Sequence, residues 1–90
     1  MDTKIEELSK LPNIGKTLAE KLVLIGIENA SQLRNTGTEN VFIRLKTVDK
    51  DACINMLCAI EGAILGIRWH DLEKVRKEEL KAFFRMTNIS

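Results

Sequence analysis

A short stretch near the N-terminus holds residue types that could bind an anion. Pro12 blocks the continuation of a preceding helix, and Asn13 and Gly15 tolerate the left-handed or crowded backbone of a tight corner. A helix that begins after such a corner leaves its first amides without partners inside the helix, at the positive end of the helix dipole. These amides can bind a phosphate, and Gly15 has no side chain to hold a nucleic-acid backbone away.

The predicted anion site consists of this corner and one lysine that follows it. Its residues are Asn13, Ile14, Gly15, Lys16, Thr17 and Lys21. Lys16 and Lys21 would supply positive charge, and contacts of this kind position a protein on DNA without reading its sequence. The alternative is that the corner only packs two helices together, and the sequence leaves both interpretations open.

Apolar residues recur at helical spacing on both sides of the corner. A short helix is predicted before Pro12, and a second helix from about Gly15 to Gly26. Their inward-facing residues are Ile5, Leu8, Leu18, Leu22 and Ile25. Two helices joined by a short corner form a helix-hairpin-helix-like unit, and this unit must position the anion site.

The remainder of the chain is also predicted to be helical. Asn29 is the predicted N-cap of a third helix that ends by Gly37, and Thr38 is the predicted cap of a fourth. A long fifth helix is expected over about residues 51–67, capped by Asp49 or Asp51, and a last one runs from between residues 70 and 74 toward Met86. Residues with high helix propensity dominate, so we predict an all-α fold, a compact bundle of about five to six helices.

The fifth helix has two unusual features. A strip of mostly small residues falls on one side of it, which would let another helix or the hairpin approach closely; its members are Asp51, Asn55, Ala59, Gly62 and Gly66. Glu61 falls inside its apolar face, where a carboxylate needs a partner. We expect a satisfied ion pair, with Arg68, Arg44 or a helix-end amide as the partner, and the alternative is a contact with another protein.

Several side chains are assigned to the core by the same spacing. Trp69 is expected to fill the core where the last helix folds back. Leu72, Val75, Leu80 and Phe83 are expected to face inward. Phe84 falls off this stripe, which leaves two alternatives: an exposed side chain near Met86 that contacts another protein, or, as we expect, part of an irregular packing patch at the C-terminus.

The charge balance argues against a dedicated polyanion binder. Lysine and arginine total 14 against 13 acidic residues, the net charge is +1 and the pI is about 7.8. Any phosphate binding would therefore involve few contacts and would be sensitive to salt. No export signal is visible, the most apolar stretch (52–67) is too short and too polar to cross a bilayer, and the two cysteines fit a reducing compartment. We expect a cytoplasmic protein without membrane contact.

The sequence offers little for catalysis or metal binding. His70 is the only histidine, and no nucleophile motif accompanies it. Cys53 and Cys58 lie five residues apart on one helix, so their side chains diverge by about 140° and are expected to be core thiols. No phosphate-binding glycine loop or acidic metal cluster is present. We therefore expect no enzyme activity, no cofactor and no metal.

Two motifs together resemble a known family. Segments 11–15 (LPNIG) and 22–27 resemble the opening of the TfoX C-terminal domain family. Segment 57–69 resembles its second hallmark, L-x-A-L-E-G-A-x-x-G-x-x-W, with Ile60 in place of the commoner leucine, and segment 77–80 fits its charged last helix. The resemblance covers nearly the whole chain, so residues 1–90 are expected to form one TfoX C-terminal-like helical domain.

The resemblance implies a regulator of bacterial natural competence, the uptake of DNA for transformation. Members usually carry this module after a separate N-terminal domain, which these 90 residues do not contain. The hairpin is also similar to a corner of the C-terminal domain of the RNA polymerase alpha subunit. We therefore expect a non-enzymatic regulatory module that contacts DNA backbone through the hairpin and works with a protein of the transcription machinery. The alternative is a protein-interaction or dimerisation module, homo-oligomers included, without nucleic-acid contact.

Overall fold

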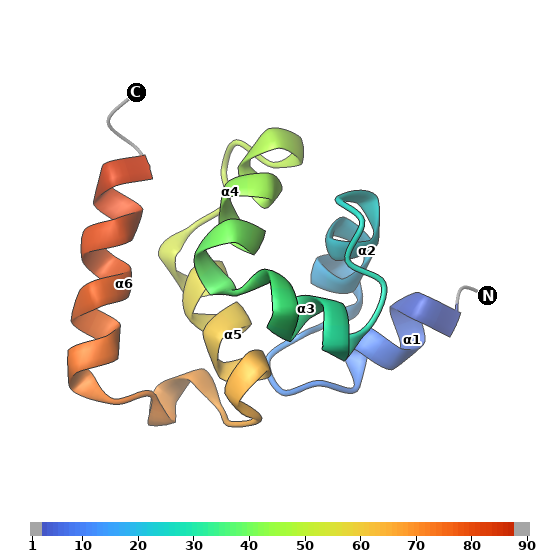
Figure 1. Cartoon of the computed structure of the whole chain (residues 1–90), viewed down its shortest axis with the longest axis horizontal. Coiled ribbons are helices and arrows are strands. Elements are labelled where there is room, and N and C mark those ends of the chain that lie inside the picture. The colour runs from blue at the N-terminus through green and yellow to red at the C-terminus, as the bar shows by residue number, and fades with distance from the viewer. Residues whose placement is uncertain (1–2, 88–90) are drawn as a thin grey trace.

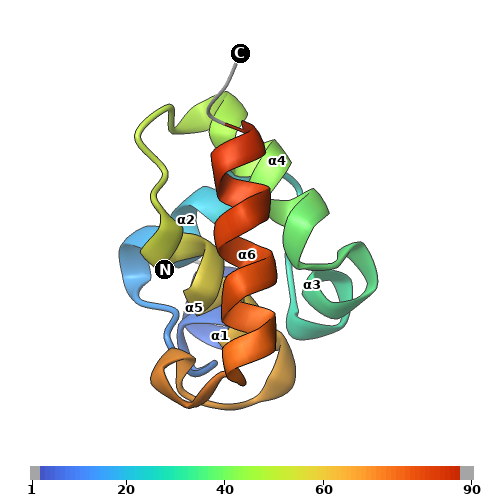
Figure 2. The same ribbon diagram turned by 90° about the vertical axis from the view of Figure 1, so that its left-hand side faces the viewer.

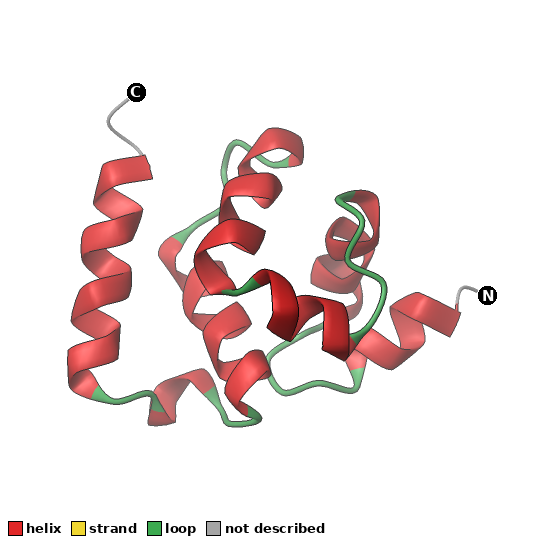
Figure 3. Cartoon of the chain, in the orientation of Figure 1, coloured by secondary structure: helices red, strands yellow, loops and turns green. Residues whose placement is uncertain are grey.

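The computed structural model describes residues 3–87. Within this range the chain forms six α-helices and one 3-10 turn, and no strand (Figures 1 and 3). In chain order they are α1 (Thr3–Ser9), α2 (Lys16–Leu24), α3 (Ala30–Thr36), α4 (Thr38–Val48), α5 (Ile54–Leu65), η1 (Trp69–Asp71) and α6 (Lys74–Thr87). The predicted all-α bundle is confirmed.

Helix α5 forms the centre of the bundle. It contacts α3, α4, α6 and η1, while α1 packs on α2 at the other end of the molecule (Figure 1). Figure 2 shows α6 as an outer helix that covers α5. Side chains from every helix meet in one core, and its fully buried large members are Leu8, Leu22, Ile27, Leu33, Val41, Phe42, Leu45, Leu57, Ile60 and Leu80.

The predicted boundaries of the first three helices are close to those observed. Asn13 adopts a left-handed backbone with φ of 69°, and α2 begins directly after Gly15. Asn29 caps α3, because its side-chain oxygen accepts a hydrogen bond of 2.8 Å from the Gln32 amide. These features depend on residues close in sequence, which is why local patterns predicted them.

The caps predicted for the next two helices are wrong. Gly37, with φ of 86°, precedes α4, and Thr38 is the first residue of that helix rather than its cap. Helix α5 begins later than expected, after Cys53, and neither aspartate caps it. Asp49 is instead the C-cap residue of α4. Its side chain forms an ion pair with Lys21 of α2 and so connects two helices.

Three side chains, those of Cys53, Val75 and Trp69, lie in surroundings other than those predicted. Cys53 is exposed, since it lies ahead of α5 rather than within it. Val75 is 70% exposed because it lies five residues before the buried Leu80, so the two point about 140° apart. Phe84, by contrast, packs in the C-terminal part of the bundle as expected: it is half-buried, with its ring centroid 5.9 Å from that of Phe42.

Trp69 is also half-buried rather than enclosed by the core. It packs against core residues and stacks on the His70 ring at 4.0 Å between centroids. The reason for its partial exposure is its position in η1, a turn at the edge of the bundle (Figure 1).

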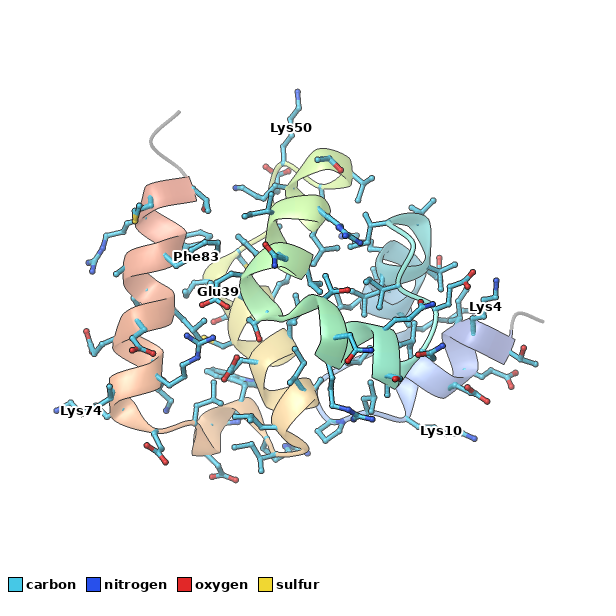
Figure 4. The ribbon with its side chains drawn as sticks, in the orientation of Figure 1. Lys4, Lys10, Glu39, Lys50, Lys74 and Phe83 are labelled. Carbon is cyan, nitrogen blue, oxygen red and sulfur yellow. The ribbon has the colours of Figure 1, made fainter. Side chains whose placement is uncertain are left out.

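Glu61 is buried and satisfied, as expected, but by a different arginine. Arg76 of α6 places Nη2 3.0 Å from a Glu61 carboxylate oxygen, and Thr38 donates to the same oxygen at 2.5 Å. Arg76 also binds both carboxylate oxygens of Glu39, at 3.1 and 3.2 Å. Figure 4 shows Glu39 and Phe83 between α4 and α6. This network and the aromatic contacts hold α6 against the bundle.

Candidate nucleic-acid interface at the hairpin

The N-terminus of α2 is open to solvent and uncapped. Gly15 is the N-cap residue, with φ of −89° and ψ of 178°, and no side chain caps the helix. The first hydrogen bond within the helix runs from the Ala19 amide to the Gly15 carbonyl at 2.9 Å. Within the described chain the amides of Lys16, Thr17 and Leu18 therefore have no partner.

None of the described residues covers this helix end. A Cβ atom placed on Gly15 would have no other atom within 4 Å, apart from its chain neighbours. Gly15, Lys16 and Thr17 are all exposed. The partial positive charge of the helix end thus faces solvent, together with the Lys16 ammonium group.

Asn13 holds the hairpin in place. Its side-chain nitrogen donates to the Ile67 carbonyl at 2.9 Å and lies 3.5 Å from the Ala59 carbonyl, and its side-chain oxygen accepts from the Trp69 amide at 3.1 Å. The contact is close, because a Cβ on Gly62 would lie 2.4 Å from the Asn13 side-chain nitrogen. The hairpin therefore does approach the small residues of α5, and the Asn13 side chain faces the protein rather than solvent.

Two other residues of the predicted site also face inward or are already paired. The Ile14 side chain is 4% exposed and belongs to the core. The Lys21 ammonium lies 2.6 Å from Asp49, and this hydrogen bond is the main reason that the pKa of the Asp49 carboxyl lies below its usual value. The structure thus places Gly15, Lys16 and Thr17 on the surface.

A shallow groove lies next to the hairpin, between α2, α5 and η1. Its volume is about 390 Å³, and it is lined by Asn13, Leu18, Asn55, Met56, Ala59, Arg68 and Trp69. Arg68 is the only charged residue among them. This groove was not predictable from the sequence, because only the fold brings residues 55–59 and 68–69 to the hairpin. The small residues of α5 are the one feature of the sequence that points to it.

Two kinds of site are absent from residues 3–87. No group of three or more histidine, cysteine, aspartate or glutamate side chains is arranged to hold a metal ion. No helix in that range is long and apolar enough to cross a membrane.

Comparison with known proteins identifies relatives over most of the chain. The sequence profile of the TfoX C-terminal domain matches residues 4–84. Protein Sxy of Escherichia coli (strain K12) is 33% identical over 75 residues, which are 83% of this chain and 36% of Sxy. The chain thus matches about a third of the length of that relative.

Two crystal structures from Listeria monocytogenes have the same fold. The triclinic form of an uncharacterized protein is 41% identical, with a TM-score of 0.90 over 91% of this chain and 93% of that one. A tetragonal form of a protein of unknown function is 39% identical, with a TM-score of 0.85 over 93% of this chain and 99% of that one.

Proposed function

This chain belongs to the TfoX C-terminal domain family, and on that premise we propose that it is a non-enzymatic regulatory module that contacts DNA backbone through the hairpin. Membership of the family implies a role in natural competence or its transcriptional control. The role of the whole Sxy protein does not transfer to this chain by itself, since the match covers 36% of Sxy.

One observation carries the DNA contact: the amides of Lys16, Thr17 and Leu18 are unpaired at an exposed helix end that begins with glycine. A phosphate oxygen can accept hydrogen bonds from such amides and gains from the helix dipole. Lys16 adds a full positive charge in the same turn. Because the chain carries a net charge of only +1, this contact is expected to be weak on its own.

Duplex binding should depend steeply on salt. If two to three phosphates are neutralised, affinity for a labelled duplex should fall roughly 12- to 40-fold between about 50 and 200 mM salt. Fluorescence anisotropy of the duplex measures this directly. An affinity that stays constant over that range would overturn the phosphate contact.

Reversing the charge of Lys16 should weaken duplex binding for every DNA sequence alike. We expect Lys16→Glu to reduce the salt slope by about one, because one phosphate contact is lost. Lys50→Glu is the matched control: Lys50 is also exposed and lies at the far end of the molecule from Lys10, which precedes the hairpin (Figure 4). Equal losses of duplex affinity in the two variants would indicate a general effect of charge and would contradict a binding site at the hairpin.

Capping the helix should have opposite effects on stability and on binding. In Gly15→Asp the new carboxylate can accept hydrogen bonds from the free amides, and the backbone at Gly15 already suits an N-cap. We expect the free energy of unfolding to rise by about 0.5–1 kcal/mol, while duplex affinity falls because the amides are occupied and the helix end is negative. Thermal melting and anisotropy on one preparation measure both, and stabilisation without loss of binding would place the DNA contact elsewhere.

The second candidate function is protein interaction without nucleic-acid contact. It is favoured by exposed apolar side chains on the outer side of α6, where Val75 is 70% and Met86 71% exposed. Light scattering on the purified chain tests it. A stable dimer, together with no duplex binding at about 50 mM salt, would favour this function over DNA contact.

A further inference from the structure

We infer that the groove beside the hairpin receives an unpaired base of single-stranded DNA whose phosphates dock at the α2 N-terminus. This inference rests on the proposed function and extends it from backbone contact to the form of the DNA. It concerns the groove lined by Asn13, Leu18, Asn55, Met56, Ala59, Arg68 and Trp69, called the Trp69 groove below.

The Trp69 groove is continuous with the proposed phosphate site. Leu18 lines the groove with its side chain and offers one of the free amides of the first turn of α2. Asn13 also lines the groove and lies directly before the corner. A nucleotide bound at the helix end would therefore have its sugar and base within reach of the groove.

The chemistry of the lining suits a base. Trp69 supplies a half-buried aromatic ring, one face of which stacks on His70, and Met56 and Leu18 supply apolar contacts. Base stacking on aromatic side chains is the usual basis of single-strand binding, and it tolerates any base because every base has a π-face. The exposed side chain of Asn55 can form hydrogen bonds with the edge of a base.

The charge around the groove suits an anionic strand. Arg68 is exposed at its edge, no carboxylate lines it, and Lys16 lies in the adjoining first turn of α2. His70, which stacks on Trp69, accepts a hydrogen bond at its carbonyl from the Lys77 ammonium at 3.1 Å, so a further cation lies beside the same turn. Phosphates on either side of the base would thus meet positive charge.

A duplex cannot use this groove without breaking a base pair. Its bases are stacked and paired, and moving one into a protein cavity costs unpairing energy that a single strand does not require. The groove therefore predicts a preference for single strands that the hairpin alone would not give.

Trp69 permits a direct test, because the chain has one tryptophan and no tyrosine. We expect a thymidine oligonucleotide of about 12 nucleotides to change Trp69 fluorescence and to bind roughly 5- to 100-fold more tightly than an abasic strand of equal length. A strand without bases keeps the phosphates, so equal affinity for the two strands would overturn the base site and leave the backbone contact intact. Loss of binding to every nucleic acid, duplex included, would overturn both.

Two further measurements complete the test: a comparison with an acidic peptide and a pair of charge-reversal variants. Polyglutamate of similar charge should bind more weakly than the thymidine strand, and equal or tighter binding would instead indicate an acidic peptide as the occupant. Arg68→Glu should lower the affinity for the thymidine strand. Arg34→Glu makes the same charge change at an exposed residue of α3 and should leave this affinity unchanged. An equal loss of affinity in both variants would contradict a base site in the Trp69 groove.

Discussion

Replacing Arg76 with alanine is expected to lower the free energy of unfolding by about 3 kcal/mol, because it leaves Glu61 as a buried carboxylate with only Thr38 as a donor. Glu61 is 8% exposed, so its carboxylate depends on hydrogen-bond donors from the protein. Chemical denaturation measures the effect. Arg85→Ala, a change on the exposed side of the same helix, is the control and should cost less than about 0.5 kcal/mol.

The same pair predicts a dependence on pH. Burial raises the pKa of the Glu61 carboxyl, but hydrogen bonds from Arg76 and Thr38 outweigh it and hold the pKa below its usual value of 4.5. A lowered pKa in the folded state means that the stabilisation is complete above about pH 4.5 and is lost as the pH falls through the folded-state pKa.

In Arg76→Ala burial acts on Glu61 without the compensating arginine, so protonation relieves the buried charge. The difference in melting temperature between wild type and Arg76→Ala should therefore narrow as the pH falls from about 7 to 4. Glu61→Gln in the Arg76→Ala background should recover part of the loss, because an amide costs less to bury than a charge. A difference that stays constant over this range would mean that Glu61 is not the group left unpaired.

The second large effect is expected at Gly62, where alanine should destabilise the protein by about 2–4 kcal/mol. A Cβ there would lie 2.4 Å from the Asn13 side-chain nitrogen and 2.7 Å from the Ile67 carbonyl oxygen. Either the hairpin moves away from α5 or the hydrogen bonds of Asn13 break. In a helix without such a neighbour, the same change would be stabilising by roughly 0.5–1 kcal/mol, so the sign of the effect is informative.

Gly15→Ala is the matched control for Gly62→Ala. The backbone at Gly15 is extended and its Cβ would meet open space, so the expected loss is only that of a poorer N-cap residue, less than about 1 kcal/mol. Asn13→Ala combined with Gly62→Ala should cost less than the sum of the single changes, since both disrupt the same contact. Additive losses would show that the hairpin and α5 are held together by something other than the Asn13 side chain.

Features that depend on neighbours in sequence were predictable. The corner at Asn13 and Gly15 follows from residue types that tolerate its backbone, and Asn29 as a cap follows from its position before an apolar repeat. The open N-terminus of α2 is also a local property, because Gly15 offers no side chain to cap it. This is why the central element of the candidate site could be read from the sequence.

Features that depend on the packing of distant segments were not predictable. The Asn13 side chain binds carbonyls 46 and 54 residues away, so nothing near it in sequence shows that it faces the protein. Lys21 resembles a free cation in the sequence, but the fold brings Asp49 to within 2.6 Å of it. Arg76 could not be chosen over Arg68 and Arg44 as the partner of Glu61 until the direction of α6 was known.

The central proposal is that the first amides of α2 bind a phosphate of DNA. Amide chemical-shift mapping of the ¹⁵N-labelled chain with a short duplex at about 50 mM salt tests it most directly, since low salt favours phosphate contacts. We predict that the largest shifts occur at the amides of residues 15–18 and disappear when salt is raised. Shifts confined to other surfaces such as α6, with residues 15–18 unchanged, would contradict it.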